Sequence, residues 1–149
     1  MMSIRYFAPD PALRPYISSY YRFESLLPHF QDLMRAELPQ IRFVMVGGGT
    51  SAFASGRVRT GHGALLQGPT SGPVRFDCPG PLWLMGVGLL PRGWAELIGL
   101  PADALADDMI PLADLIGRPA DDAVEALGTA SDDASRVAAL DRLFGDMLV

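Results

Sequence analysis

Up to residue 91, short runs of aromatic and aliphatic residues alternate with clusters of Gly, Pro, Ser and Thr. Runs of this length and composition predict β-strands joined by turns. The expected strands are 16–23, 41–46, 63–68, 73–78 and 81–90, with one or two short strands in 51–59 around Gly56. Closely spaced strands of this kind favour a sandwich or small barrel over βαβ units.

After Pro91 the apolar residues recur at helical spacing. Acidic residues stand in the first turns of the last two segments, where the helix dipole favours negative charge. The expected helices are 92–100, 101–107, 120–127 and 132–148, with a connector over 108–117. The sequence therefore predicts an α+β protein, with a β-rich region over 1–91 and a small helical region over 92–149.

Apolar residues line one side of the last expected helix. They are Val137, Leu140, Phe144 and Met147. Such a stripe packs either against the body of the same domain or against a second copy of the helix in a homodimer. Both interpretations stay open at this point. The chain ends at Val149, within or just after this helix, so we expect a boundary inside a longer protein.

The 149-residue chain is 49% hydrophobic, which favours one packed core over disorder. Its longest apolar run, 81–91, is interrupted by Gly and is shorter than the about 18 residues that a membrane span needs. The N-terminus lacks the pattern of a signal peptide. Cys78 is the single cysteine, as is usual in a reducing compartment. We therefore expect a cytoplasmic protein without a membrane partner.

Charge restricts the function further. All 12 basic residues are Arg, and 17 acidic residues give a net charge of −5. Phosphate neutralisation needs a basic face, so this acidic chain is a poor match for nucleic acid. The absence of Lys excludes Schiff-base chemistry and Walker-type phosphate binding.

The segment IRFVMVGGGTSA (41–52) has the G-x-G-x-x-A spacing of a dinucleotide-binding loop. The matching residues are Gly47, Gly49 and Ala52. Such a loop opens a helix and is followed by an acidic residue about 20 positions on. Here further glycines interrupt the next segment, and no Asp or Glu occurs within 38–76. We interpret the glycines as a turn at the end of the core strand 41–46.

Few residues qualify as metal ligands or catalysts. His29 and His62 are the only histidines, and neither lies in an H-x-H or H-x-x-H pattern. A metal-binding barrel needs several histidines facing inward together, so a site of two histidines and a carboxylate is the remaining alternative. Cys78 could pair with a histidine as a nucleophile, although buried, unreactive cysteines are commoner. The sequence predicts no metal, no cofactor and no catalytic residue.

The expected strands are rich in aromatic and sulfur-bearing side chains. Because alternate residues of a strand face opposite sides, a barrel with spare interior volume would hold an apolar pocket with a few polar tips. The alternative is a filled core. The candidate residues for a small-molecule pocket are Tyr21, Phe23, Phe43, Met45, Phe76, Trp83 and Met85.

Four stretches carry a family resemblance. They are YFAPDPALRPYISSYYRFE (6–24), LPQIRFVMVGGG (38–49), LLQGPTSGP (65–73) and GVGLLPRGWAELIGLPADALADDMIPLADLIG (86–117). Together they resemble the N-terminal, non-DNA-binding domain of AraC/XylS-type bacterial transcriptional regulators. The last stretch is the most specific. The chain departs from the pattern at ELPQ (37–40), where relatives commonly carry a turn like P-D-G.

The resemblance implies a cupin-like antiparallel β-barrel or sandwich followed by a small C-terminal helical subdomain. It implies a regulatory domain that serves effector sensing, dimerisation or both. The expected partners are a small-molecule effector and a second copy of the chain, with DNA bound only through a helix-turn-helix domain downstream. The alternatives are a small cupin-like enzyme, such as an isomerase or a metal-dependent oxygenase, and a free-standing small-molecule-binding module.

Overall fold

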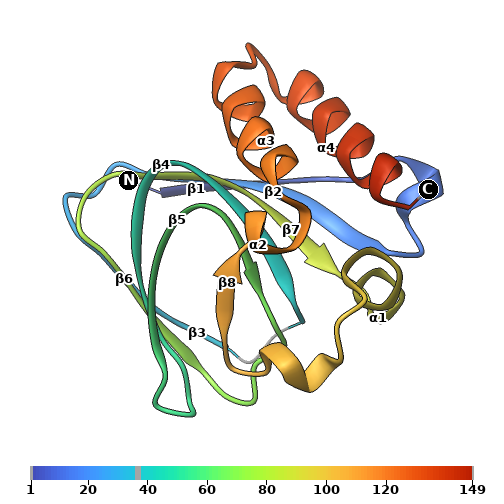
Figure 1. The fold of residues 1–149 in the computed structure, drawn as a ribbon. Coiled ribbons are helices and arrows are strands. Elements are labelled where there is room, and N and C mark those ends of the chain that lie inside the picture. The colour runs from blue at the N-terminus through green and yellow to red at the C-terminus, as the bar shows by residue number, and fades with distance from the viewer. Residues whose placement is uncertain (1, 36–37, 149) are drawn as a thin grey trace.

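A computed structural model describes residues 2–35 and 38–148. The chain forms an antiparallel β-sheet folded over into an open barrel, with helices packed on the outside of one wall (Figure 1). Glu37, from the ELPQ departure, and Val149, at the expected boundary, lie outside the described residues.

The strands are β1 (Met2–Phe7), β2 (Ile17–Ser25), β3 (Phe30–Met34), β4 (Gln40–Ala52), β5 (Val58–Gln67), β6 (Val74–Cys78), β7 (Leu82–Leu89) and β8 (Met109–Pro111). The helices are α1 (Pro91–Gly93), α2 (Ala113–Ile116), α3 (Arg118–Thr129) and α4 (Asp133–Met147). Short 3₁₀ helices cover Pro11–Leu13 and Ala102–Leu105, and a π-helical segment covers Trp94–Ile98.

The strands pair antiparallel in the order β1-β2-β7-β4-β5-β8, while β6 pairs with β4 and β3 with β6. Strand β4 belongs to both halves of the barrel, because its first part pairs with β7 and its last part with β6. In the part of the chain that the structure describes, β1 and β3 each have one neighbouring strand and so form free edges. The prediction of an α+β barrel or sandwich followed by helices is confirmed.

The three glycines 47–49 lie inside β4 and do not end it. The strand continues to Ala52, and its register with β5 shifts between Val44 and Gly49. Gly47 has a φ of +87°, which residues with a Cβ rarely adopt. An irregularity of this kind bends a strand, so the glycines carry β4 from one half of the barrel to the other. The predicted turn is wrong because glycine suits a bulge as well as a turn, and pairing partners decide between them.

Helices α3 and α4 cover the outer face of the sheet (Figure 1). Leu140 and Phe144 of α4 are fully buried in a cluster that includes Phe43 of β4. Val137 and Met147 are partly buried against the same cluster. The apolar stripe of the last helix thus packs within the chain, and a homodimer stays a prediction.

A second apolar cluster fills part of the barrel interior. Strand β4 contributes Phe43 to the cluster under the helices and Val44 to the cluster inside the barrel. At this point of β4 both faces of the wall are therefore apolar. Each fully buried side chain of this size stabilises the fold by about 1.5–3 kcal/mol relative to an exposed one.

The sequence did not predict β1, β3 and β8. β1 and β3 are edge strands with largely exposed side chains, and β8 has only 3 residues, so their apolar signal is weak. β8 also places a strand inside the region predicted as helical. Among the described residues, no helix is long and apolar enough to cross a membrane.

Candidate functional site

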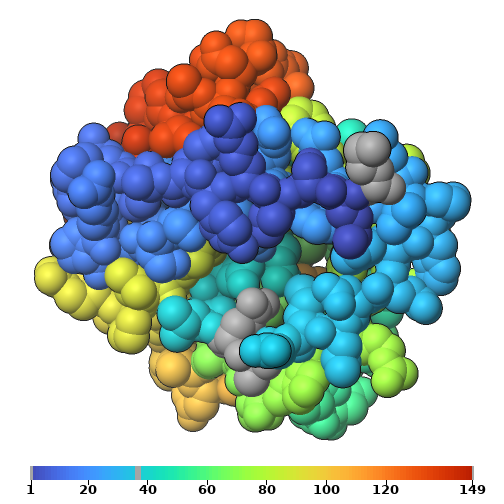
Figure 2. Space-filling view, turned by 180° about the vertical axis from the view of Figure 1, so that it is seen from behind, coloured from blue at the N-terminus to red at the C-terminus, as the bar shows by residue number. Residues whose placement is uncertain are grey.

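A cavity of about 610 Å³ lies between the free edges of β1 and β3, with β2, β7 and β4 on its inner side. Figure 2 shows this side of the molecule, which is hollowed between the dark blue strand β1 and the light blue residues of β3. The volume falls within the range of about 300–1,000 Å³ that is usual for small-molecule sites.

Cross-strand register arranges the residues beside the cavity in rows. One row, from β1 to β4, is Tyr6, Tyr21, Gly86 and Arg42. The next row, from β2 to β5, is Ser19, Gly88, Gln40 and Gln67. Residues in one row lie on the same face of the sheet as direct neighbours. The pairing of strands distant in sequence therefore brings the polar side chains of both rows together.

Gly86 leaves room for the ring of Tyr21. A Cβ at Gly86 would lie 1.9 Å from Tyr21 Cζ and 2.4 Å from the Tyr21 hydroxyl oxygen. The ring occupies the space of the missing side chain and reaches across β7, so that its hydroxyl lies 2.6 Å from Gln40 Oε1 on β4. The packing of the Tyr21 ring thus explains why Gly86, the first glycine of the GVG segment, has no side chain.

Hydrogen-bond donors gather at this polar end of the cavity. The Tyr21 hydroxyl donates to Gln40 Oε1 and accepts a long hydrogen bond of 3.4 Å from Arg42 Nε. Arg42 Nη1 donates to Gln67 Oε1 at 2.9 Å. Gln67 is 1% exposed, and its Nε2 is buried without a hydrogen-bond partner among the described residues.

Aromatic side chains form the rest of the walls. The ring centroids of Phe23 and Phe30 are 5.5 Å apart, and those of Phe30 and Phe76 are 6.2 Å apart. Across the cavity mouth, the rings of Tyr6 and Tyr21 are 6.1 Å apart. All three pairs are tilted, an arrangement that aromatic rings favour. The cavity thus combines an aromatic body with one polar end.

The structure divides the pocket residues predicted from the sequence. Tyr21, Phe23 and Phe76 line the cavity. The others lie on the opposite face of the sheet, toward the helices: Phe43 and Met85 are fully buried there, Met45 is partly buried against the same cluster, and the Trp83 ring lies under Arg136 of α4. The grouping of seven is corrected, because both faces of β4 and β7 are apolar and alternation alone does not say which face is inside.

Sequence reasoning missed the apolar wall residues Tyr6, Phe30 and Leu84, and it missed every polar residue at the polar end except Tyr21. Gln40, Arg42 and Gln67 sit on strands whose neighbouring positions are apolar and buried. A polar residue at an inward position of such a strand was the available signal. This signal can be used only when it is known which side of each strand faces the cavity. One inward-facing residue such as Tyr21 fixes this for β2, but it does not fix it for β4 or β5.

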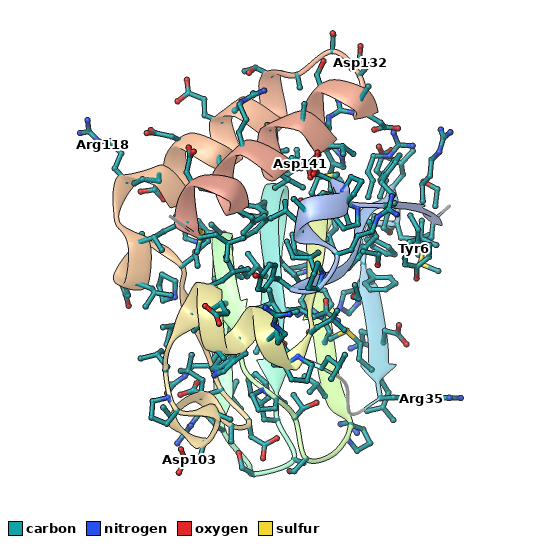
Figure 3. All side chains as sticks on the ribbon, turned by 90° about the vertical axis from the view of Figure 1, so that its right-hand side faces the viewer. Tyr6, Arg35, Asp103, Arg118, Asp132 and Asp141 are labelled. Carbon is teal, nitrogen blue, oxygen red and sulfur yellow. The ribbon has the colours of Figure 1, made fainter. Side chains whose placement is uncertain are left out.

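The outer face of β2 contacts helix α4. The Tyr20 hydroxyl donates to Asp141 Oδ1 at 2.8 Å, and Figure 3 shows Asp141 lying between α4 and the barrel. Arg22 Nη1 donates to both carboxylate oxygens of Asp133, at 2.7 and 2.6 Å. Arg136 donates to Asp133 from within α4. Burial, together with the bond to Asp141, raises the pKa of the Tyr20 hydroxyl well above its ordinary value.

The titratable residues named in the sequence are scattered. His29 pairs with Asp77 at the surface, His62 is exposed on β5, and the Cys78 thiol is buried beside the Gly80 carbonyl. Within residues 2–35 and 38–148, no group of three His, Cys, Asp or Glu side chains is placed to hold a metal ion.

Several solved structures are similar to this chain at low sequence identity. The AraC-like transcriptional activator CuxR aligns over 99% of this chain and 59% of its own, at 13% identity and a TM-score of 0.47. The EutQ protein of Clostridium difficile aligns over 59% of this chain and 67% of its own, at 13% identity and a TM-score of 0.43. A cupin domain of an XRE family transcriptional regulator from Enterobacter cloacae aligns over 61% and 98%, at 14% identity and a TM-score of 0.43. The likeness to these three structures is one of overall fold and says nothing of what this chain binds or does.

No curated protein matches the chain in sequence. One family, described as the domain of unknown function DUF6597, matches residues 5–111. The match runs from β1 to β8 and so includes the walls of the cavity. The chain therefore belongs to the DUF6597 family.

Proposed function

We propose that this chain is the effector-sensing domain of an AraC-type transcriptional regulator. The cavity between β1 and β3 binds a small organic molecule and does not transform it. The domain acts in the cytoplasm as a homodimer, and a separate helix-turn-helix domain binds DNA. The motifs in 6–24 and 86–117 support the proposal, and the position of strand β2 carries it.

Strand β2 separates the cavity from helix α4. Its residue Tyr21 lines the cavity, while its neighbours Tyr20 and Arg22 hold α4 through hydrogen bonds to Asp141 and Asp133. Successive residues of a strand face opposite sides, so a displacement of β2 moves both sets together. A ligand that favours one position of β2 would therefore bias the position of α4.

Hydrogen bonds between charged side chains and a stacked ring pair join β2 to α4. Asp133 accepts from Arg22 and Arg136, and all three side chains are mostly buried, at 18%, 23% and 12% exposure. Hydrogen bonds to charged groups contribute about 1.5–3 kcal/mol each where solvent is excluded. The Tyr20 ring also stacks on Phe144 of α4, with centroids 6.4 Å apart.

Ligand binding is tested by thermal unfolding of the chain against a panel of small aromatic and aliphatic metabolites. A ligand raises the midpoint of unfolding in wild type, and Phe23→Ala weakens this shift. Mass spectrometry of the recovered compound then separates the sensing domain from the cupin-like enzyme, since a sensed molecule is returned unchanged. A compound converted in proportion to protein and time would contradict the proposal.

The coupling is tested by hydrogen exchange of the α4 backbone amides. Ser19→Phe places a ring in the cavity opposite Gly88, so that the new side chain imitates a bound ligand. Ser55→Phe, in the turn between β4 and β5, is the matched control. We expect Ser19→Phe to change exchange in α4 and Ser55→Phe to leave it unchanged. The regulatory proposal fails if α4 responds neither to Ser19→Phe nor to any stabilising compound.

A further inference from the structure

Two carboxamides lie side by side at the polar end of the cavity: Gln40 lines the cavity, and its cross-strand neighbour Gln67 is buried behind it. Gln67 Oε1 accepts from Arg42 Nη1 at 2.9 Å, and because a guanidinium can only donate, this orientation is fixed. Gln40 Oε1 lies 2.6 Å from the Tyr21 hydroxyl, which already accepts from Arg42 Nε and so turns its proton to Gln40. Both carboxamide oxygens are therefore occupied.

The nitrogen atoms of the two carboxamides are not used in these hydrogen bonds. Within residues 2–35 and 38–148, Gln67 Nε2 is buried without a hydrogen-bond partner, and the Gln40 side chain makes no hydrogen bond besides the one from Tyr21. A buried N–H group without an acceptor is costly. Among the described side chains, the polar end thus has more hydrogen-bond donors than acceptors, and the guanidinium of Arg42 lies beside Gln40.

The remainder of the cavity is apolar and ring-lined. Phe23, Phe30 and Phe76 form one continuous set of tilted rings, and Tyr6 faces the cavity from β1. A flat ring system in the cavity would add further tilted or offset contacts to this set. A hydroxyl or amide group on such a ring would bring its own donor to a polar end already rich in donors, whereas a carboxylate brings acceptors only.

We infer that the ligand is an aromatic carboxylate, with its rings between Tyr6 and the phenylalanines and its carboxylate accepting hydrogen bonds from Gln40 Nε2 beside Arg42. The inference rests on the proposed function, in which this cavity is the ligand site. Asp32 also borders the cavity, from β3; it is exposed, and solvent screens its repulsion.

The test uses three probes with one ring system: 2-naphthoate, 2-naphthamide and 2-naphthylmethylammonium. Isothermal titration calorimetry at neutral pH measures their affinities for wild type, Gln40→Glu and Gln31→Glu. Gln40→Glu replaces the donor by a carboxylate of the same shape, and Gln31→Glu makes the same change on the exposed face of β3, outside the cavity. Thermal unfolding checks that each variant is folded, and Gln40→Met serves as a neutral replacement if Gln40→Glu is not.

In wild type we expect 2-naphthoate to bind about tenfold or more tightly than 2-naphthamide. Gln40→Glu loses this preference and gains affinity for the ammonium probe, while Gln31→Glu behaves as wild type. Equal binding of acid and amide, or an acid preference that survives both Gln40→Glu and Gln40→Met, overturns the inference and leaves the sensing function intact. If no naphthalene probe binds but another compound of the panel stabilises the domain, the inference again fails alone; if no compound stabilises it, the proposed function fails as well.

Discussion

Tyr20 and Tyr21 are neighbours in the chain, and their hydroxyl groups donate hydrogen bonds on opposite faces of one strand. Tyr20 reaches Asp141 on α4 at 2.8 Å, and Tyr21 reaches Gln40 beside the cavity at 2.6 Å. A single layer of β-sheet therefore separates the cavity from the helices, and a hydrogen bond is made on each face of this layer.

Gly86→Ala should displace Tyr21, because the new Cβ would lie 1.9 Å from Tyr21 Cζ. We expect a loss of about 1–3 kcal/mol in the free energy of unfolding, as is usual for overpacking. Urea denaturation measures it. Gly145→Ala is the matched control, since a Cβ at Gly145 in α4 would have open space around it within 4 Å, and it should stabilise the domain by about 0.5–1 kcal/mol. If Gly86→Ala left the free energy of unfolding unchanged, the Tyr21 ring would have moved aside without loss of stability, against this prediction.

Arg22→Gln and Asp133→Asn should each loosen α4, and their effects should not add. A double-mutant cycle is expected to give a coupling free energy of about 1–3 kcal/mol, because Arg22 Nη1 contacts both oxygens of Asp133. Arg142→Gln, an exposed arginine on the same helix, should change the free energy of unfolding by less than about 0.5 kcal/mol. Strict additivity of Arg22→Gln and Asp133→Asn would show that this ion pair does not hold α4.

Stability should fall at alkaline pH. The Tyr20 pKa is raised in the folded protein, so Tyr20 keeps its proton there after the unfolded chain has lost it near pH ~10. The unfolded state then binds fewer protons, and the free energy of unfolding decreases as pH rises above that value, while the contribution of Tyr20 is fully present below it. Urea denaturation between about pH 8 and 11 measures the decline. Tyr20→Phe should flatten it, and Tyr6→Phe, at an exposed tyrosine, should leave the wild-type decline in place.

Phe144→Ala should cost about 3–5 kcal/mol, since Phe144 is 0% exposed and stacks on Tyr20. Met147→Ala, on the same stripe but only partly buried, should cost less. Thermal unfolding ranks the two. Sedimentation of wild type tests the predicted homodimer independently of this packing, and equal costs for the two variants would contradict the burial of the stripe within the chain.

The architecture followed from local patterns, and the site did not. Strands β2, β6 and β7 are rich in aromatic or aliphatic residues and are bounded by turn residues, so their positions were predicted closely. One face of the sheet packs on helices and the other lines the barrel, so both faces bury apolar residues. Which side of a strand faces the cavity therefore depends on the neighbouring elements and cannot be read from the strand's own sequence. Alternation therefore places Phe43 and Met85 in the cavity as readily as under the helices, where they lie.

The polar end shows a second limit of sequence reasoning. Gln40, Arg42 and Gln67 meet through the pairing of β4 with β5, and Tyr21 joins them only because β7 places a glycine between. Nothing in the spacing of these residues marks them as partners. Register between strands must be known first, and register is set by the whole barrel.

Strand β4 is the common edge of the two cavity walls, since β7 and β6 both pair with it. The angle between the walls is set by three consecutive glycines, at each of which a methyl group would meet a backbone oxygen: Pro81 O at 2.3 Å, Gly61 O at 2.8 Å and Asp77 O at 2.5 Å. Backbone atoms yield far less than side chains, so substitutions here cannot tune the opening gradually. A change in the size of the cavity would therefore have to come from the residues that line its walls, such as Phe30, Leu84 and Gly88.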